Sequence, residues 1–224
     1  MIKIGDIYFP DIERHFQGFG DDVADYQRPQ REYAMKFVKV WDTALDLGAN
    51  VGIFSRHFAA HFRQVIAVDP LQDNIECLQK NVPGNVKIVK TAVGDRSGSF
   101  KIYKPRKSLG GAFVADHENV EVPPGLEAKI NDATIEAVEM CTVDSMDLEN
   151  VGLIKLDIQG SELIALKGAT QTLSRCNPVI LIEEKPLGGP GGSMAHVHES
   201  RDFLLACGYK MEKLVGADRV YVRE

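Results

Sequence analysis

A nine-residue stretch, residues 44–52, constrains the fold of this chain more than any other. It reads Ala-Leu-Asp-Leu-Gly-Ala-Asn-Val-Gly, so a short apolar run ends in an acid and then in a turn of small residues. Apolar side chains at helical spacing follow over residues 53–62. This order predicts a buried strand, a tight turn and a helix. Gly48 and Gly52 allow backbone angles that other residues disfavour, and we expect the turn to approach a ligand closely.

Alternating strands and helices extend this pattern over most of the chain. Strands are expected at residues 43–47, 64–70, 86–89, 153–157 and 178–183, with closing strands at 209–215 and 219–222. Helices are expected at residues 53–60, 71–82, 161–173 and 198–207. Gly168 is expected to bend the third of these helices. The order predicts a doubly wound α/β fold with a mostly parallel sheet and a terminal antiparallel strand.

Length favours one domain, because 224 residues and 24.7 kDa leave little room for a second. The single domain over 1–224 divides into an N-terminal cover at 1–40, a core at 42–224, a variable insertion at 100–140 and a glycine–proline lid loop at 186–197. The cover is expected to hold a strand at 2–9, a polar loop at 21–25 and a helix at 31–40. Residues 92–103 are expected to form a hairpin or continue the third strand, and 104–140 show little periodicity.

Charge and cysteine usage exclude several classes of partner. The net charge of −6 argues against a nucleic-acid partner, because phosphate binding depends on clustered Lys and Arg. The four cysteines lie far apart, unlike the close pairs of a zinc site, and indicate a reducing compartment. No apolar run has the length of a signal-peptide core or a membrane span. We therefore expect a cytoplasmic protein without a membrane partner, and a homo-oligomer is left open.

Acidic residues stand at the ends of four expected strands. They are Asp46, Asp69, Asp157 and Glu183. Any one of them could cap the helix that follows it. In an open parallel sheet, however, ligands bind beyond the carboxyl ends of the strands, and a carboxylate there is costly unless it binds something polar. Four such acids in phase therefore predict a ligand site at this edge of the sheet.

The spacing from the glycine turn to Asp69 is typical of an acid that binds ribose hydroxyls. That geometry serves NAD and other adenosyl cofactors alike. The turn distinguishes them, because Asn50 occupies the position of the middle glycine of a dinucleotide motif. Its side chain stands where a pyrophosphate needs close backbone approach. An NAD-linked oxidoreductase is therefore the alternative and an adenosyl cofactor the first interpretation.

Several motifs together resemble the FkbM family of methyltransferases. Residues 46–52 and 68–70 are similar to the S-adenosylmethionine (SAM) site of Rossmann-like methyltransferases. The further motifs are residues 92–96, 142–146, 154–162, 166–169 and 177–180. The resemblance covers about residues 42–183 and extends loosely to Tyr209; the order and spacing of the motifs carry it. It implies a seven-stranded sheet and SAM-dependent methylation of a hydroxyl on a sugar or secondary metabolite.

The resemblance also implies roles for individual residues. It implies that Asp46, Gly48, Ala49, Asn50 and Gly52 surround the methionine part of SAM, that Asp69 and Asn74 serve the ribose, and that Thr91, Ala92 and Val93 lie near the adenine. Two positions depart from the family pattern. Gln159 stands where a Glu is common, which removes one charge, and Asp69 stands where Glu is frequent.

Transfer to a hydroxyl needs a group that accepts its proton, and several residues are candidates. Asp157 is the first, although it could instead cap the helix near Ser161; Glu162 could serve the cleft or only the first turn of that helix. His196 and His198 follow the lid loop, and their spacing suits opposite sides of an extended segment, so one is expected to face the site. Glu183 completes the catalytic candidates. Asp157, Glu183 and a loop histidine could hold a divalent cation, but we expect no metal.

The methyl acceptor is expected to be a small molecule, such as a sugar or nucleotide-sugar. Lys101, Lys104, Arg106 and Lys107 form one basic cluster, which is either a solvated loop or the grip on an anionic acceptor. Tyr26, Gln27 and Arg28 of the cover could close over the cofactor. A cofactor-binding fold that has lost catalysis and serves as an interaction module is a further alternative.

Overall fold

The computed structural model describes residues 1–105, 112–115, 133–186 and 193–223. Its main sheet has seven strands in the order β12-β13-β11-β10-β3-β4-β5. They are β3 (Thr43–Leu47), β4 (Gln64–Val68), β5 (Val86–Val89), β10 (Val151–Leu156), β11 (Val179–Glu183), β12 (Lys210–Val215) and β13 (Asp218–Val222). Neighbouring strands from β5 to β11 pair in parallel, whereas β13 is antiparallel to both β11 and β12. The predicted doubly wound, mostly parallel sheet with a terminal antiparallel strand is confirmed.

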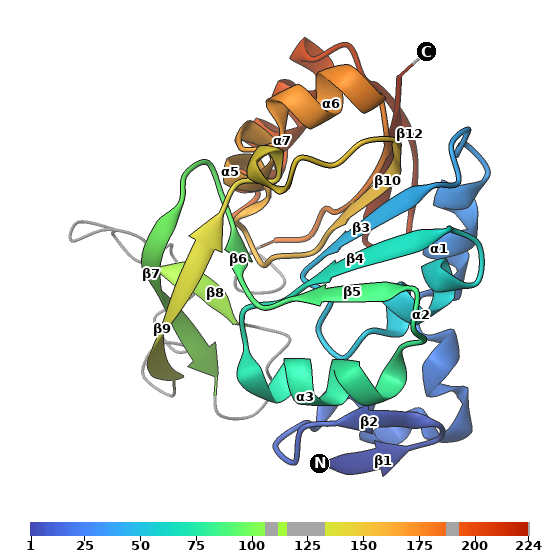
Figure 1. Cartoon of the computed structure of the whole chain (residues 1–224), viewed down its shortest axis with the longest axis vertical. Coiled ribbons are helices and arrows are strands. Elements are labelled where there is room, and N and C mark those ends of the chain that lie inside the picture. The colour runs from blue at the N-terminus through green and yellow to red at the C-terminus, as the bar shows by residue number, and fades with distance from the viewer. Residues whose placement is uncertain (106–111, 116–132, 187–192, 224) are drawn as a thin grey trace.

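The direction of the strand order reverses between β3 and β10, at the centre of the sheet (Figure 1). The chain runs outward from β3 through β4 to β5, then returns to the other side of β3 with β10 and β11. Every residue of β3, β10 and β11 is buried, as expected for parallel strands covered on both faces. The carboxyl ends of β3 and β10 therefore form the topological switch point, where this fold binds ligands.

Helices cover both faces of the sheet. Successive side chains along a strand point to opposite faces, so each one packs against the helices on its own side. The helices of one face are α1 (Arg28–Met35), α2 (Ile53–Ala59) and α3 (Gln72–Asn81), and those of the other are α5 (Glu162–Lys167), α6 (Thr170–Cys176) and α7 (Ala195–Ala206). Leu45 and Leu47 pack toward α5–α7, whereas Ala44 packs toward α1 and α2. Because side chains alternate along a strand, Asp46 also faces α2. Among the described residues, every helix is too short or too polar to cross a bilayer.

The expected single helix over 161–173 is two helices, α5 and α6. Gly168 lies between them, and a Cβ there would stand 1.9 Å from the carbonyl oxygen of Gly94. Close contact with the chain at Gly94 therefore interrupts the helix, so the expected bend is a complete break. The short 3-10 helix η4 (Asp144–Met146) precedes this pair, and Asp144 accepts hydrogen bonds from the backbone N–H groups of Gln171 and Thr172 in α6.

A second sheet stands beside the main one, in the order β6-β9-β7-β8 (Figure 1). Its strands are β6 (Ala92–Val93), β7 (Gly98–Pro105), β8 (Phe113–Ala115) and β9 (Ala133–Cys141). The expectation of little regular structure over 104–140 is wrong for residues 104–105, 113–115 and 133–140, which belong to β7, β8 and β9. Ile135 is 58% exposed, while Glu136 lies on the strand face that carries buried Val138 and Met140. This mixture hides the apolar alternation that identifies a strand.

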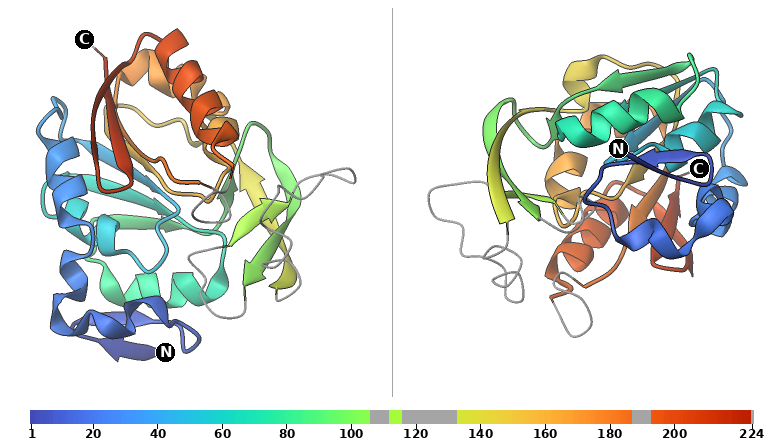
Figure 2. Two further views of the ribbon diagram at one scale, coloured as in Figure 1. Left: turned by 180° about the vertical axis from the view of Figure 1, so that it is seen from behind. Right: turned by 90° about the horizontal axis from the view of Figure 1, so that it is seen from below.

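The N-terminal cover is a hairpin followed by short helices. The expected strand at 2–9 is two strands, β1 (Ile2–Ile4) and β2 (Ile7–Phe9), and the expected polar loop at 21–25 belongs to the 3-10 helix η2 (Gly20–Asp25), which follows η1 (His15–Gly18). Helix α1 begins and ends earlier than predicted, because Pro29 in its first turn favours a helix start there. Phe16 packs against Tyr26 with ring centroids 4.9 Å apart. Figure 1 shows the hairpin of the cover below α3, and Figure 2 gives two further views of it; Tyr8 N of β2 donates to Asn81 Oδ1 of α3 at 2.8 Å.

Candidate functional site

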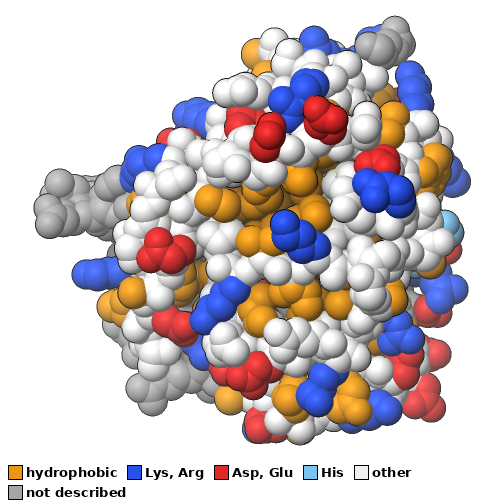
Figure 3. Space-filling view, viewed as in Figure 1, with side chains coloured by type: hydrophobic (Ala, Val, Ile, Leu, Met, Phe, Trp, Pro, Cys, Tyr) orange, Lys and Arg blue, Asp and Glu red, His pale blue; other side chains and the backbone are white. Residues whose placement is uncertain are grey.

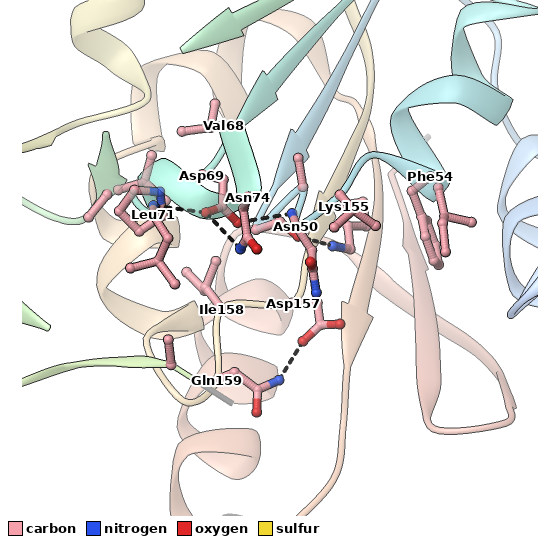
Figure 4. Close-up of a pocket in the computed structure, with 18 of the residues that line it drawn as sticks. Asn50, Phe54, Val68, Asp69, Leu71, Asn74, Lys155, Asp157, Ile158 and Gln159 are labelled. Carbon is pink, nitrogen blue, oxygen red and sulfur yellow. Dashed lines mark hydrogen bonds between the residues drawn. The ribbon is translucent and has the colours of Figure 1, made fainter. Parts of the chain in front are cut away.

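A cavity opens at the switch point between β3 and β10. The empty space between its lining atoms is about 920 Å³, part of it open to solvent. Its lining includes the turn after β3, the ends of β4 and β10, the start of β6, and Phe16, Tyr26 and Gln27 from the cover. Small-molecule sites usually occupy about 300–1,000 Å³ and lie at such positions. Figure 4 shows Asp69 and Asn74 on one side of this cavity, and Asp157 and Gln159 on another.

Asp69 and Asn74 form a polar pair in the cavity wall. The Asp69 carboxylate accepts hydrogen bonds from Asn50 N (2.9 Å), Leu71 N (3.0 Å) and Asn74 Nδ2 (3.1 Å). Burial raises the pKa of Asp69 to about 6, against these hydrogen bonds. Asn74 Oδ1 is buried and has no hydrogen-bond partner. An orphaned acceptor beside a carboxylate with spare lone pairs is suited to a pair of hydroxyl donors, so these residues fit the ribose of an adenosyl cofactor.

Thr91, Ala92 and Val93, which the resemblance implies near the adenine, line the cavity together. The Thr91 hydroxyl lies 3.0 Å from the carbonyl oxygens of Ala92 and Glu139 and donates to them, which ties the end of β5 to β9. Leu71, Ile102 and Ile158 add apolar surface to the same lining. Such a wall suits a flat ring that shows one polar edge to the backbone, as adenine does.

The glycines of the turn serve the packing of the protein itself. Gly48 has φ +79°, and a Cβ on it would stand 2.1 Å from the carbonyl oxygen of Asp157. Gly52 has φ +93°, and its Cβ would stand 2.3 Å from Leu78. We expected these glycines to admit a ligand, but close approach of β10 and α3 is what requires them. Gly48, Ala49 and Asn50 line the cavity, whereas Gly52 is not among its lining residues.

Asp46 also lies outside the cavity lining. It is fully buried against α2, where its carboxylate accepts a hydrogen bond from Ser55 Oγ at 2.6 Å and pairs with Lys155 Nζ at 3.2 Å. The role of Asp46 beside the methionine part of SAM, which the resemblance implies, therefore stays a prediction, and its contacts are with Ser55 and Lys155. Lys155 lines the cavity and donates to the carbonyl oxygen of Gly48 at 2.8 Å. Asp46 thus holds Lys155, a residue that we did not predict, against the turn.

Asp157 and Glu183 are joined by the residue that departs from the family pattern. Gln159 Nε2 donates to Asp157 Oδ1 at 2.7 Å and to Glu183 Oε2 at 3.2 Å. Gln159 has φ +56°, a left-handed conformation that costs a non-glycine residue about 1 kcal/mol. A Glu side chain at this position has no amide hydrogens, so it would bring a third carboxylate into the group instead of bridging two. Asp157 lines the cavity, and Gln159 beside it does so too.

Asp218 joins this acidic group from the last strand. The antiparallel register of β11 and β13 places it opposite Glu183. It is 5% exposed, and its Oδ2 has no hydrogen-bond partner. Lys185 Nζ neutralises part of the charge through a contact of 2.5 Å with Glu183. Burial and then the charge of Asp157 raise the pKa of Glu183 to about 8 and that of Asp218 to about 7.

These raised pKa values predict that the ligand-free protein loses stability as the pH rises. The folded state holds a proton on Glu183 up to about pH 8, whereas an unfolded glutamate releases it near its usual 4.5. Between these values the unfolded state binds fewer protons, so Glu183 alone lowers the free energy of unfolding by up to about 4 kcal/mol. We expect urea denaturation from pH 4.5 to 8 to show this fall, a flatter curve for Glu183→Gln, and no flattening for the exposed Glu139→Gln. Equal slopes in all three proteins would contradict the assignment.

The remaining catalytic candidates lie elsewhere. His196 and His198 belong to the first turns of α7 instead of an extended segment, and neither lines the cavity. The expected lid loop is thus helical from Ala195, and its residues 187–192 lie outside the described part of the chain. Glu162 Oε1 accepts hydrogen bonds from the backbone N–H groups of Ile158 and Gly160, so it stabilises the turn in front of α5. Of the residues that the structure describes, neither Asp157 nor another side chain caps α5 at its N-cap residue, Ser161.

The surface charges give no strong basic face in the view of Figure 3, where acidic and basic side chains are interspersed. Lys104 of the basic cluster pairs with Asp73 at 2.5 Å, and Lys101 is exposed. Arg106 and Lys107 lie outside the described residues. Arg28 pairs with Asp25 and does not line the cavity. In the described ranges, no group of three or more His, Cys, Asp and Glu residues is arranged to hold a metal ion.

Known proteins share this architecture. A methyltransferase FkbM from Methylobacillus flagellatus KT superposes with a TM-score of 0.54 at 16% identity, covering 86% of this chain and 50% of that one. The chain thus spans about half the length of that relative. Precorrin 8w decarboxylase from Methanobacterium thermoautotrophicum gives a TM-score of 0.50 at 12% identity, with both chains fully covered. These likenesses show the fold.

Sequence comparison is more specific. No curated protein matches the chain. The family model of the methyltransferase FkbM domain, however, matches residues 46–211, which include the turn after β3, the Asp69–Asn74 pair and the Asp157–Gln159–Glu183 group. The resemblance inferred from the motifs is thereby confirmed, and the chain belongs to the FkbM methyltransferase domain family.

Proposed function

We propose that this protein is a SAM-dependent O-methyltransferase that acts on a hydroxyl of a small acceptor, such as a sugar or secondary metabolite. Membership of the FkbM family implies methyl transfer from SAM. The observation that carries the proposal is the Asp69–Asn74 pair in the cavity wall, with one buried acceptor atom still unpartnered. An NAD-linked oxidoreductase has no support in the family match.

In this proposal, Asp69 and Asn74 bind the two ribose hydroxyls, and the wall of Thr91, Ala92 and Val93 receives the adenine. The turn of Gly48, Ala49 and Asn50 borders the methionine part of the cofactor, together with Lys155. When bound, SAM supplies an electrophilic methyl group on its sulfonium. The protein aligns the acceptor oxygen with that methyl group and receives the proton that the hydroxyl loses.

Asp157 is the proposed proton acceptor, because its carboxylate lies in the cavity lining at the end of β10. Gln159 fixes this carboxylate from one side with its amide hydrogens, which leaves the other oxygen to accept a hydroxyl proton. Glu183 contacts Gln159 and Lys185, outside the cavity lining, and we assign it to positioning instead of direct proton transfer.

Titration calorimetry with SAM tests the proposal, and the same titration of the Asp69→Ala variant tests the assignment of this residue to the ribose. Removal of this carboxylate is expected to weaken SAM binding by about 10- to 100-fold, because charged hydrogen bonds of this kind contribute about 1.5–3 kcal/mol. The matched control is Asp73→Ala, which removes a partly exposed carboxylate that lies in the first turn of α3 and outside the cavity lining.

Two results would contradict the proposal in different ways. If the unchanged protein binds no SAM, the methyltransferase assignment fails, and the fold would be a module without this cofactor. If it binds SAM but Asp69→Ala and Asp73→Ala bind equally well, the cofactor is retained and the ribose assignment fails. A screen of SAM consumption against sugars and nucleotide-sugars then identifies the acceptor.

A further inference from the structure

A second cavity lies between the N-terminal cover, α1 and α2. The empty space between its lining atoms is about 480 Å³, part of it open to solvent. Its lining residues are Ile7, Ala24, Arg28, Arg31, Ile53, Arg56 and His57. Four of these seven side chains are basic and none is acidic. In a protein with a net charge of −6, this composition is unexpected for a cavity that binds nothing.

Arg31 is the most buried of these side chains, with 1% exposure. Its Nη1 donates to the carbonyl oxygen of Ile53 at 3.1 Å and its Nη2 to that of Ala24 at 3.0 Å. Its Nε is buried and without a partner, and among the described residues no carboxylate forms an ion pair with it. Burial, followed by the charge of Arg28, lowers the pKa of Arg31 to about 10, so it remains cationic at neutral pH. The guanidinium lies over the ring of Phe54, 5.3 Å from its centroid, which offsets part of the cost of burying the charge. A bound anion would offset more of that cost, because a buried cation without an ion-pair partner is expensive.

His57 adds a second unpartnered polar atom to the same cavity. Its Nε2 is buried and makes no hydrogen bond. Burial and then the charge of Arg31 lower the pKa of His57 to about 4, which makes the imidazole neutral at pH 7. A neutral imidazole still carries one N–H donor. The neutral His57 side chain can therefore donate to an anion without adding a further buried charge.

Arg28 and Arg56 are more exposed than Arg31, with half and 41% of the side-chain surface accessible, respectively. Arg28 pairs with Asp25, and Arg56 pairs with Asp6 at 2.5 Å. Exposed ion pairs of this kind contribute little free energy, so an incoming anion can compete with either aspartate. The guanidinium groups present planar donors that match the oxygens of phosphate.

We propose that this cavity is a binding site for a phosphate-type oxyanion, either free phosphate or the phosphoryl group of an organic phosphate. Arg31, Arg56 and His57 bind the oxygens, and Arg28 contributes at the rim. The site is separate from the cavity at the switch point, although Ile53 lines both. Its existence does not depend on the proposed methyl transfer. If Arg31 served only to tie α1 to the start of α2, the cavity would bind no anion.

Calorimetric titration with inorganic phosphate in a phosphate-free buffer at pH 7.5 tests this site, and a parallel titration uses ribose 5-phosphate as a phosphomonoester. We expect saturable binding of at least one of the two at one site per chain. Tighter binding of the ester would identify an esterified phosphoryl group as the ligand. Arg56→Gln is expected to raise the Kd by at least about 10-fold, because it removes a charged hydrogen bond.

Arg63→Gln is the matched control, since Arg63 is another exposed arginine paired with an aspartate, Asp42. Its Kd is expected to equal that of the unchanged protein. Arg31→Gln is expected to abolish binding, and its circular dichroism spectrum shows whether the fold is retained; Arg56→Gln tests the site independently of that variant. Absence of saturable binding of both ligands would overturn the proposal, as would equal weakening by Arg56→Gln and Arg63→Gln. Loss of phosphate binding in saturating SAM would overturn the separateness of the two cavities.

Discussion

Asp157→Asn is expected to lower kcat by about 10²- to 10⁴-fold, the range over which a positioned acid or base contributes to catalysis. The substitution keeps the size of the side chain and the hydrogen bond that Gln159 can make to its oxygen. It removes the basic oxygen that receives the proton of the acceptor hydroxyl. Because Asp69 and Asn74 are untouched, affinity for SAM is expected to change little.

Single-turnover methylation of an acceptor from the SAM-consumption screen, together with calorimetry, separates the two effects. Asp95→Asn is the control, because it makes the same chemical change in a half-exposed carboxylate outside the cavity lining. Full turnover in Asp157→Asn would contradict its role as proton acceptor and leave it only as a residue that lines the cavity. An equal loss in turnover and in SAM affinity would instead point to a disturbed cofactor site.

Lys155→Met is expected to lower the free energy of unfolding by about 3–5 kcal/mol, the cost of leaving a buried charge without its partner. Asp46 is 0% exposed and would retain only the hydroxyl of Ser55. The carbonyl oxygen of Gly48 would lose its donor as well. Urea denaturation monitored by circular dichroism measures the change.

The double variant Asp46→Asn, Lys155→Met is the informative comparison. It removes both charges, so much of the lost stability is expected to return, as buried ion pairs replaced by neutral residues are often nearly neutral in effect. Lys155→Ala would be a poorer test, because it also creates a cavity. A loss below about 1 kcal/mol in the single variant would show that Asp46 is solvated or protonated in the folded protein.

The parallel core was predictable because its strands are short apolar runs that end in an acid. Residues of β3, β10 and β11 are buried on both faces, so their sequences contain almost no polar interruption. Strand β9 was missed, since exposed Ile135 and inward Glu136 contradict its alternation. Whether such a segment forms a strand depends on its packing against neighbouring strands, and the local sequence does not show that packing.

The spacing from the turn predicted Asp69 as a site residue and the resemblance added Asn74; the structure brings the two side chains together in the cavity wall, beside Asn50. Residues that reach the site through topology could not be found in this way. Asp218 is brought to Glu183 by the register of an antiparallel pair, and Lys155 is aligned with Asp46 by a parallel one. His196 and His198 were chosen because they follow the fifth strand closely in sequence. In the structure they lie in the first turns of α7, and neither lines the cavity.

The hydroxyl of Thr91 helps to determine which parts of the second sheet can vary in sequence without disturbing the cavity. It bonds to the carbonyl oxygens of Ala92 and Glu139, at the joint between the two sheets. Ala92 and Val93 pair there with Met140 and Cys141. As long as this short parallel joint is kept, together with Ile102 and Ala112, which also line the cavity, other parts of the second sheet can change without moving the wall proposed for adenine. The outer part of the second sheet is therefore where substitutions can accumulate while the lining of the cavity is preserved.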